Sequence, residues 1–321
     1  MTDSNEKYSS DFVDNPRFTG KKSTKFRAPM VDDEFMIPLR SFDEYKDKYR
    51  RMWNLERTDN GILTAKWHTD GKELEYCVAF HRSMWQLYKD IGQDADTEVL
   101  IVGGAGEFFL KKFKDSLDER ANMKWYAYEH MFYDGINNII SQVNDLRIPT
   151  IGVINGSGYH TEWATLCDIT IMADDAIISD PHFIMGALPG DGIQTAMRKL
   201  LGIKRANYAM YMNEQFDAQK ALDYGLVNEI VPRDKVYERA QEIAQFIMTK
   251  PRIVRRLTAE LVKQPWQEAF AKELRPNFGM EMWSFMANEA VDHESAFRQL
   301  QELEAAALEK SRLKKDAGDD E

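Results

Sequence analysis

Residues 150–192 read TIGVINGSGYHTEWATLCDITIMADDAIISDPHFIMGALPGDG, and this stretch says most about the fold. Its segments 150–156 and 168–173 are short apolar runs of the kind that form buried β-strands, and the first ends in glycine. The stretch also contains His160 and His182, two of the six histidines, each near a strand end or a helix start. Loops at such positions usually carry the catalytic residues of α/β proteins. We therefore expect the functional site in this stretch.

Strands and helices alternate on the N-terminal side of this stretch. The hydrophobic pattern predicts strands over 62–67, 74–79 and 98–104, and helices over 81–91 and 121–146. On the C-terminal side it predicts helices, over 191–201, 203–212, 217–224, 234–248 and 251–262. This order of elements predicts an α/β fold with a helical C-terminal third.

The two ends of the chain differ from this middle part. Residues 1–45 are polar and mixed in charge with no sustained period, which predicts an arm that is disordered or wraps a partner subunit. Residues 296–321 begin with a helical pattern and finish as DAGDDE. That end predicts a charged, solvated helix followed by an acidic tail.

Composition excludes several classes of function. The 321 residues include 53 acidic and 42 basic side chains, and the net charge of −11 argues against binding to nucleic acid or to an anionic membrane. No apolar run approaches the roughly 20 residues of a membrane-spanning helix, and the N-terminus lacks the pattern of a secretory signal. Two cysteines, Cys77 and Cys167, cannot form a disulfide framework. We therefore expect a soluble, cytoplasmic protein.

His160 lies in the segment Gly-Ser-Gly-Tyr-His-Thr-Glu, directly after a predicted strand and a glycine turn. An imidazole at this place can donate a hydrogen bond to a carbonyl oxygen, in the role that a backbone oxyanion donor often has. The alternative is a histidine that only caps or packs at the start of a helix. Glu162, two residues further on, belongs either to an ion pair or to the same site.

His182 and Asp191 are the second pair of candidates. An imidazole beside a carboxylate has a fixed tautomer and a raised basicity, which suits a general base that acts on water. Gly186, Pro189 and Gly190 lie between the two residues and can fold Asp191 back toward His182. The competing interpretation makes Asp191 the N-cap of the helix that begins with IQTAMRKLL.

Other features of the sequence are less decisive or exclude a kind of site. His81 opens a predicted helix and Glu281 lies on a late aromatic helix, and the residues alone leave each as structural or functional. No histidine pair at i, i+4 and no Cys-x-x-Cys occurs, so we expect no metal. The glycine cluster over 103–109 lacks the spacing of a nucleotide loop, and no Gly-x-Ser-x-Gly elbow is present. We therefore expect no cofactor and no nucleophilic serine.

Three segments together resemble the crotonase superfamily of enoyl-CoA hydratases and isomerases. They read IPTIGVING from residue 148, CDITIMADDAIISDPHFIMGALPGDGIQTAMRKLLG from residue 167 and ALDYGLVNEIVP from residue 221. The similarity covers about residues 55–262. It implies a crotonase-like spiral of ββα units over 46–233. It also implies a helical region over 234–295 that mediates trimer formation, often as a dimer of trimers.

Some residues differ from the hydratases of this superfamily in an informative way. Those enzymes carry a glycine-rich oxyanion loop and two catalytic glutamates, on segments equivalent to 156–162 and 180–184. Here Glu162 occupies the first glutamate position and His182 the second. A Tyr-His pair that ends at His160 replaces part of the glycine run.

These substitutions resemble the β-diketone hydrolases, the carbon–carbon hydrolase branch of the superfamily typified by 6-oxocamphor hydrolase. The resemblance implies that His182 and Asp191 activate water and that His160 binds the carbonyl or enolate oxygen. It also implies that His81 and Glu281 lie near the pocket. The implied reaction is retro-Claisen cleavage of a cyclic 1,3-diketone by water, which gives a keto acid.

Aromatic and acidic residues around the expected pocket are candidates for contact with a bulky, apolar diketone. They are Tyr76, Phe108, Tyr159 and Glu162. Two other functions stay open. One is a CoA-dependent hydratase, lyase or thioester hydrolase, although the sequence EFFL at 107–110 replaces the loop that contacts CoA in the family. The other is a crotonase fold without catalysis that serves as a binding protein.

Overall fold

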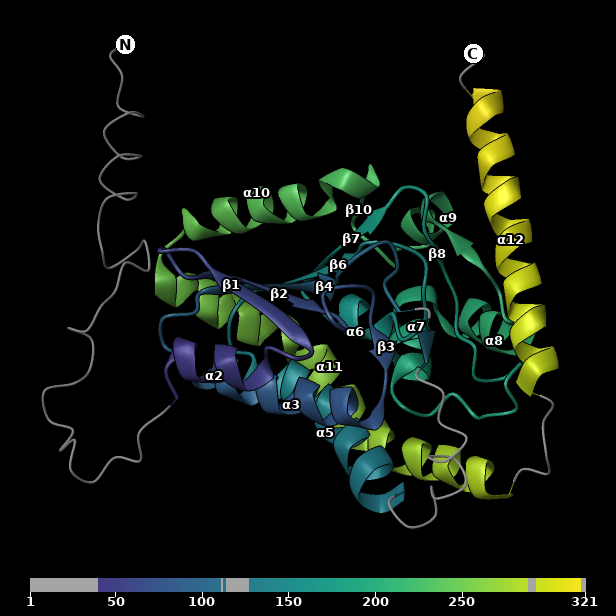
Figure 1. Cartoon of the computed structure of the whole chain (residues 1–321), viewed down its shortest axis with the longest axis horizontal. Helices are drawn as coiled ribbons and strands as arrows, with labels where there is room; N and C mark the ends of the chain where they lie inside the picture. Colours follow the sequence, from purple (N-terminus) through teal and green to yellow (C-terminus); the bar gives the residue numbers. More distant parts are fainter. Residues whose placement is uncertain (1–39, 111, 114–126, 288–292, 319–321) are drawn as a thin grey trace, which may run out of the picture.

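The computed structural model describes residues 40–110, 112–113, 127–287 and 293–318, and its centre is a six-stranded sheet (Figure 1). The strand order is β1-β2-β4-β6-β7-β10. β1 and β2 form an antiparallel pair, and the other neighbouring pairs in this sheet are parallel. The strands span Trp53–Arg57 (β1), Ile62–Trp67 (β2), Val99–Gly104 (β4), Thr150–Ile154 (β6), Ile169–Ala173 (β7) and Glu229–Val231 (β10).

The parallel part of the sheet is covered on both faces. Every residue of β4 and β6 is buried, as expected of strands between two helical layers. Figure 1 shows one helix along one face and others along the opposite face: α10 (Val236–Met248) on the first, and α3 (Val78–Gln93), α5 (Asp134–Ile140) and part of α11 (Arg252–Ala287) on the second.

One glycine of the sheet brings a short helix close to the strands. A Cβ at Gly152 of β6 would lie 2.3 Å from the carbonyl oxygen of Ala164 in α6 (Glu162–Thr165). A side chain at this position would therefore push α6 away from the sheet. The glycine thus fixes where Glu162, the first residue of α6, lies relative to β6.

Short strand pairs and further helices surround this centre. β3 (Glu75–Tyr76) pairs in parallel with β5 (Lys112–Phe113), and β8 (Ile177–Ile178) pairs antiparallel with β9 (Phe216–Asp217). The π-helical segments η3 (Ala127–Tyr133) and η4 (Ser141–Asp145) flank α5. The remaining helices are α2 (Phe42–Tyr49), α7 (Ile193–Leu201), α8 (Ile203–Met212), α9 (Ala218–Asp223), the 3₁₀ turn η5 (Arg233–Lys235) and α12 (His293–Gly318).

The predicted α/β class and most of the predicted elements are confirmed. β2, β4, β6 and β7 lie within the predicted strands, and α7, α8, α9 and α10 lie within the predicted helices. Residues 127–145 of the helix predicted over 121–146 are helical, and residues 121–126 lie outside the described residues.

The strand predicted over 74–79 is wrong. Only Glu75 and Tyr76 pair as a strand, and α3 already begins at Val78. Buried side chains follow a helical spacing of three and four from that point on: Phe80, Met84, Leu87, Tyr88 and Ile91. The packing of this helical face outweighs the strand-like pattern of the sequence LEYCVA.

The helix predicted over 251–262 is much longer than expected. α11 continues to Ala287 through two prolines, Pro265 and Pro276. A proline inside a helix removes one backbone hydrogen bond and predicts a break. Side chains beyond the first proline are nevertheless buried at spacings of four: Phe270, Leu274 and Phe278. Their packing against α5 and its neighbours keeps this segment helical.

Both ends of the chain are helical where the structure describes them. α2 begins at Phe42 with a capping box, in which the Glu44 amide donates to the Ser41 hydroxyl and the Ser41 amide donates to the Glu44 carboxylate. Residues 1–39, most of the expected arm, lie outside the described residues, and so do residues 319–321 of the expected acidic tail.

The long α11 helix presents an apolar stripe to solvent. Ile253, Leu257 and Leu261 follow one another at spacings of four, and each is more than half exposed. An apolar patch on a protein surface commonly marks a contact with another chain. No helix within the described ranges is both long enough and apolar enough to cross a membrane. From the exposed apolar stripe itself, we expect another copy of this chain to cover these residues.

We expect the protein to assemble as a homotrimer or as a dimer of trimers, with this stripe in the contact between subunits. Light scattering during gel filtration at micromolar concentration should give the mass of three or six chains. Leu257→Lys should favour smaller species, because it places a charge in a buried apolar contact. Glu260→Lys changes an exposed residue of the same helix and is the control. A stable monomer of the unaltered protein would contradict this expectation.

Candidate active site

Ionisable side chains from four segments of the chain meet in one buried group. The segment from the turn after β6 to the start of α6, the segment after β8, the residues before α7 and the C-terminal part of α11 each contribute to it. We call this group the acid–base cluster, and it consists of His160, Glu162, Asp180, His182, Asp191 and Glu281. The sequence predicted each of these residues except Asp180.

His160 is held by two carboxylates and by aromatic stacking. Its Nδ1 lies 2.9 Å from Glu162 Oε1 and 3.3 Å from Asp191 Oδ2. The ring stacks on Trp163, with the centroids 4.7 Å apart and the planes 8° from parallel. The backbone of His160 has φ +54°, a left-handed conformation that is uncommon for any residue except glycine. Strain of this kind persists where the surrounding structure enforces it, and it often marks a functional site.

His182 has a different hydrogen-bond partner from the one the sequence predicted. Its Nδ1 lies 2.6 Å from Asp180 Oδ1, and its backbone amide also donates to that oxygen. On the other side of the ring, Nε2 lies 3.7 Å from Asp191 Oδ2 and 3.8 Å from Glu281 Oε1. The residue that orients His182 is therefore Asp180 and not Asp191. The motif Asp-Pro-His could have indicated Asp180 as the partner of His182, since a carboxylate two residues before an imidazole can fold back onto the ring.

Asp191 lies between the two imidazoles. Its Oδ2 faces both His160 and His182, and its Oδ1 accepts a hydrogen bond from the Ile193 amide. The interpretation of Asp191 as the N-cap of α7 is wrong, because the N-cap position is occupied by Gly192. The predicted proximity of Asp191 to His182 is confirmed, with Nε2 as the nitrogen that faces it.

Glu281 connects the cluster to α11. Its Oε2 accepts a hydrogen bond from the Gly190 amide at 3.0 Å. A Cβ at Gly190 would lie 2.3 Å from the carbonyl oxygen of Asn277, so the loop can pack this closely on α11 only with glycine at this position. Asp191 directly follows this contact, and α11 therefore sets its position.

The carboxylates raise the pKa of both imidazoles. Burial alone would lower the pKa of His160, but Glu162 and Asp191 outweigh it and raise the pKa to about 10. Burial opposes the charge on His182 in the same way, and Asp180 and Asp191 raise its pKa well above the ordinary value. Both rings therefore carry a proton at neutral pH.

The pKa values of the carboxyl groups shift in different directions from one residue to the next. Burial and then the charge of Asp191 raise the pKa of Glu162 and of Glu281. Burial would also raise the pKa of Asp191, but His182 and His160 outweigh it and lower the pKa. Asp191 is thus the ionised carboxylate between two cationic rings, and the two glutamates retain protons more readily. A site with acids and bases of such different strength can move protons internally.

Tyr76 and His81 extend the cluster on one side. The Tyr76 ring stacks on His160 and also contacts the ring of His81, with centroids 5.7 and 5.9 Å apart. His81 Nδ1 lies 3.2 Å from the carbonyl oxygen of His130. Burial lowers the pKa of His81 to about 4, so this ring is neutral and Nδ1–H is the donor to the carbonyl.

The other two predicted substrate-binding residues lie beside the cluster in the chain. Phe108 follows β4, and its carbonyl accepts a hydrogen bond from the Asn155 side chain. Tyr159 directly precedes His160 and is buried. Burial and then the carboxylate of Glu304 in α12 raise the pKa of Tyr159 to about 12. A role of either side chain in substrate binding stays a prediction.

Two subsets of the cluster offer the donor atoms of a divalent metal site. One atom each of His160, Glu162 and Asp191 lie within 4.8 Å of one another, and the same holds for His182, Asp191 and Glu281. Imidazole and carboxylate donors together suit ions such as zinc. In this cluster the imidazole protons already provide positive charge between the carboxylates. The expectation of a metal-free site stays a prediction.

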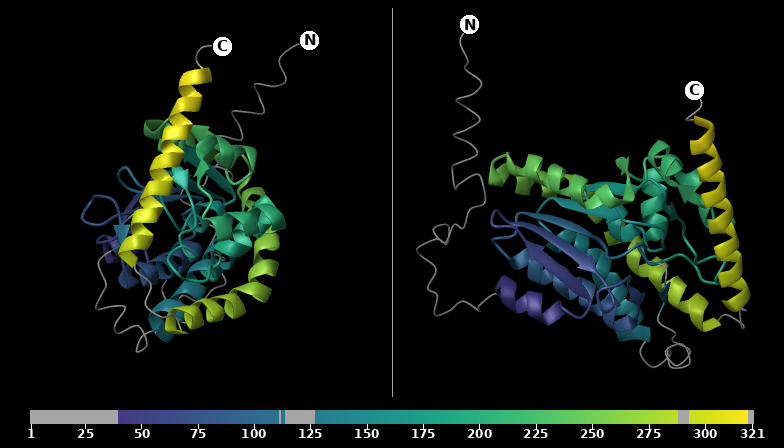
Figure 2. Two further views of the ribbon diagram at one scale, coloured as in Figure 1. Left: turned by 90° about the vertical axis from the view of Figure 1, so that its right-hand side faces the viewer. Right: turned by 45° about the horizontal axis from the view of Figure 1, so that its top comes forward.

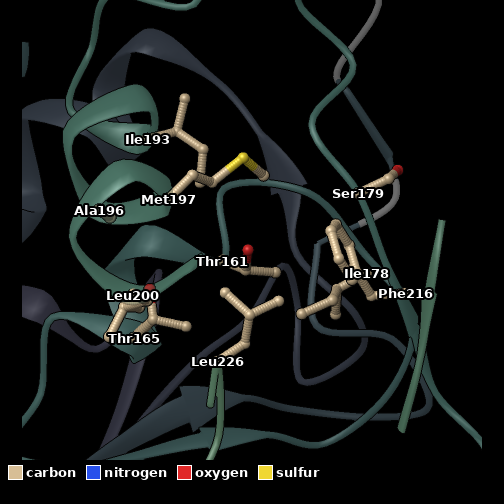
Figure 3. Close-up of a pocket in the computed structure, with 10 residues that line it drawn as sticks. All are labelled: Thr161, Thr165, Ile178, Ser179, Ile193, Ala196, Met197, Leu200, Phe216 and Leu226. Atoms are coloured by element: carbon tan, nitrogen blue, oxygen red, sulfur yellow. The ribbon is translucent and has the colours of Figure 1, made fainter. Parts of the chain in front are cut away.

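Cavities flank the segment that carries His182 and Asp191. Figure 3 shows the smaller one, a mainly apolar space between α6, α7, β8 and β9 that has room for about one water molecule. The larger one has a volume of about 680 Å³, and its lining includes Phe183, Leu188 and Tyr211. That volume lies within the range of small-molecule pockets.

The sequence model of the enoyl-CoA hydratase/isomerase family matches residues 59–298. The chain belongs to this family. The resemblance to the crotonase superfamily is therefore confirmed, and so is the crotonase-type fold.

Curated relatives in the enoyl-CoA hydratase/isomerase family include enzymes of CoA thioesters. The chain is 28% identical over 164 residues to carnitinyl-CoA dehydratase of Citrobacter koseri, a match that covers 50% of this chain and 62% of that protein. It is 27% identical over 220 residues to hydroxycinnamoyl-CoA hydratase-lyase of Pseudomonas fluorescens, covering 60% and 77%. The chain thus spans less than two thirds of the dehydratase.

A solved structure of a different kind of enzyme is also similar to this chain. It is a β-diketone hydrolase from the cyanobacterium Anabaena sp. PCC 7120 bound to (S)-3-oxocyclohexyl acetic acid, with a TM-score of 0.71 and 27% identity. The similarity covers 76% of this chain and 98% of that chain. Proteins similar to this chain therefore include enzymes named for CoA thioesters and one named for diketone hydrolysis. Which reaction such a fold supports depends on the residues of the site.

We expect two histidines of this family member to keep opposite charge states from about pH 5 to about pH 9. His81 should stay neutral because burial lowers its pKa to about 4, and His160 should stay protonated because its pKa is about 10. Carbon–proton NMR spectra of histidine-labelled protein follow each ring, and His81→Gln and His160→Gln assign the signals. A His160 signal that titrates near the ordinary value of 6.5 would overturn this charge assignment.

Proposed function

We propose that this protein is a hydrolase that cleaves a carbon–carbon bond of a cyclic 1,3-diketone by attack of water. The observation that carries the proposal is His160, a protonated imidazole on a left-handed turn where the hydratases have glycine. The amides before it already have partners: Gly158 donates to the Ile177 carbonyl and Tyr159 to the Leu110 carbonyl, at 3.1 and 2.8 Å. This geometry favours the imidazole over those amides as the donor to a substrate oxygen.

Cleavage of a 1,3-diketone needs a hydrogen-bond donor at the developing enolate oxygen. One carbonyl is attacked by water, and the other accepts the electrons of the broken bond as an enolate. Both carboxylate contacts of His160 use Nδ1, so Nε2–H is the hydrogen for the enolate oxygen. A positioned donor at a developing oxyanion lowers the barrier by about 3 kcal/mol. His160 is well suited to this role because its pKa of about 10 keeps it cationic at neutral pH.

His182 is the proposed base. Asp180 holds Nδ1, which fixes the tautomer and leaves Nε2 as the reactive nitrogen. Asp191 and Glu281 lie 3.7 and 3.8 Å from Nε2, too far for strong direct hydrogen bonds, so Nε2 stays accessible to a reacting water. The raised pKa makes the neutral form of His182 the minor form at neutral pH, and this form takes a proton from water while the new carbon–oxygen bond forms. The carbon–carbon bond then breaks, and the same proton returns to the enolate carbon.

The ligand of the Anabaena enzyme suggests a substrate to test. (S)-3-oxocyclohexyl acetic acid is a keto acid, the class of product that this reaction gives. Joining its carboxyl carbon to the ring carbon opposite the side chain, with loss of water, gives bicyclo[2.2.2]octane-2,6-dione. That diketone cannot enolise between its carbonyls, because the carbon there is a bridgehead. The cavity of about 680 Å³ adjoins the His182 segment through Phe183 and is large enough for a molecule of this size. Its lining is mixed, with apolar side chains beside the polar Gln194 and Arg198, and does not include the residues of the acid–base cluster.

A CoA-thioester hydratase or lyase is the second candidate. Glu162 occupies the position of the first hydratase glutamate, and burial and Asp191 raise its pKa, as suits a general acid. The curated relatives that act on CoA thioesters favour this candidate as well. His182 at the second glutamate position, with His160 in the oxyanion turn, favours the diketone hydrolase.

Incubation with bicyclo[2.2.2]octane-2,6-dione should give 3-oxocyclohexyl acetic acid, measured by chiral gas chromatography. Crotonyl-CoA, followed through its enoyl absorbance, is the matched substrate for the second candidate. We expect diketone cleavage without hydration of the thioester. Hydration of crotonyl-CoA with no cleavage of bicyclic or monocyclic 1,3-diketones would reject the proposal. Turnover of neither class would favour a binding protein.

Variants of His182 and Asp180 should separate chemistry from orientation. His182→Ala should lower the rate of diketone cleavage by about 10²- to 10⁴-fold, the usual contribution of a general base. Because neutral His182 is the active form, kcat/KM should rise with pH through the raised pKa of this residue. Asp180→Asn removes a charge that raises this pKa, so the rise should move to lower pH and the maximal rate should fall.

The pH profile of Asp180→Asn distinguishes orientation by Asp180 from a purely structural effect. Asp59→Asn, at an exposed turn, is the control and should leave the profile unchanged. An Asp180→Asn profile that coincides with that of the unaltered protein would show that Asp180 does not act on the base.

A further inference from the structure

The C-terminal helix α12 packs on the body of the protein through one face of its first half. Ala296, Leu300 and Glu304 follow at spacings of four and are buried. α12 contacts the strand pair β8–β9, and it runs along that side of the molecule in Figures 1 and 2. The family match ends at residue 298, so most of α12 lies beyond the matched residues.

The strand pair β8–β9, on which α12 packs, is connected to the segments that contain His160 and His182. After Ile178, the last residue of β8, the chain continues directly to Asp180 and His182. The carbonyl of Ile177 accepts from the Gly158 amide, and the Ile177 amide donates to the Ser157 hydroxyl. β8 therefore holds the turn that leads to His160 as well as the segment that leads to His182.

Glu304 is the polar member of the buried face of α12. It is only 6% exposed, and Tyr159 is 5% exposed. The charge of Glu304 acts on the Tyr159 hydroxyl and, after burial, is the next cause of the raised pKa of that group. Tyr159 is bonded to His160, the residue on the left-handed turn. A buried carboxylate of α12 thus acts electrostatically on the residue that precedes His160, and α12 itself contacts the strand pair that holds the turn.

We propose that α12 braces the active-site turn, and that Glu304 is a positioning residue that acts through Tyr159 on His160. The catalytic consequence of this brace rests on the proposed function, whereas its effect on the His160 ring does not. A strained turn keeps its conformation only when its surroundings enforce it. This turn holds a histidine at φ +54° at the place where the hydratases that this chain resembles have a glycine-rich loop. α12, through its contacts with β8 and β9, supplies part of the surroundings that enforce this turn.

Glu304→Ala tests the brace, with Glu302→Ala on the exposed face of the same helix as the matched control. Glu304→Ala should lower kcat for bicyclo[2.2.2]octane-2,6-dione by about 10- to 100-fold, because a shift of about 1 Å in a catalytic group can cost that much. KM should change little. The NMR signals of the His160 ring should move in the free protein, while those of His68, on another side of the molecule, should not.

A double-mutant cycle identifies the path from Glu304 to His160. If Glu304 acts through Tyr159, the losses from Glu304→Ala and Tyr159→Phe should not add. Additive losses would mean that Glu304 acts by another path and would reject this part of the proposal. Glu304→Gln keeps the size of the side chain and provides the same measurements if the alanine variant does not fold.

The NMR readout separates failure of the brace from failure of the proposed function. If the protein cleaves no diketone but the His160 signals move in Glu304→Ala, the brace stands and the assigned reaction is wrong. If Glu304→Ala folds with unchanged His160 signals and unchanged kcat, the brace is rejected whatever reaction the enzyme catalyses.

Discussion

A buried charge is tolerated only where opposite charges or hydrogen bonds replace the water it has lost, and the acid–base cluster is built on this constraint. Two protonated imidazoles lie among carboxyl groups that come from α6, the segment after β8, the residues before α7, and α11. Removing one partner would leave the others as uncompensated buried charges, at a cost of about 3–5 kcal/mol. The cluster is therefore complete only when the sheet and the C-terminal helices are both in place.

The same constraint explains how a family of thioester enzymes can carry a different reaction. Replacing a glycine-rich turn by His160 exchanges neutral amide donors for one cation, and this cation requires Glu162 and Asp191 beside it. The left-handed backbone at His160 adds strain that these contacts and the stacking on Trp163 offset. Charge, strain and packing thus act on one residue, and the proposed reaction depends on that residue.

The sequence predicts the parts of this structure that depend on local pattern. β6 and β7 were predictable because each is a continuous apolar run, and the helices from α7 to α10 because caps and breaks bound them. The helix predicted over 251–262 was too short, because long-range packing of Phe270 and Leu274 keeps α11 helical beyond Pro265. The membership of His182 in the site was predictable. Its partner Asp180 was not identified, because the turn in which it folds back onto the ring appears only in three dimensions.

The central claim is that water is added across a carbon–carbon bond and not across a double bond. The most direct measurement is turnover of bicyclo[2.2.2]octane-2,6-dione in ¹⁸O-labelled water and, separately, in D₂O, with mass spectrometry of the product. The account predicts one ¹⁸O atom in the new carboxyl group and one deuterium on the carbon next to the ketone. A product that keeps the bicyclic skeleton, with the ¹⁸O in a hydroxyl group, would contradict it.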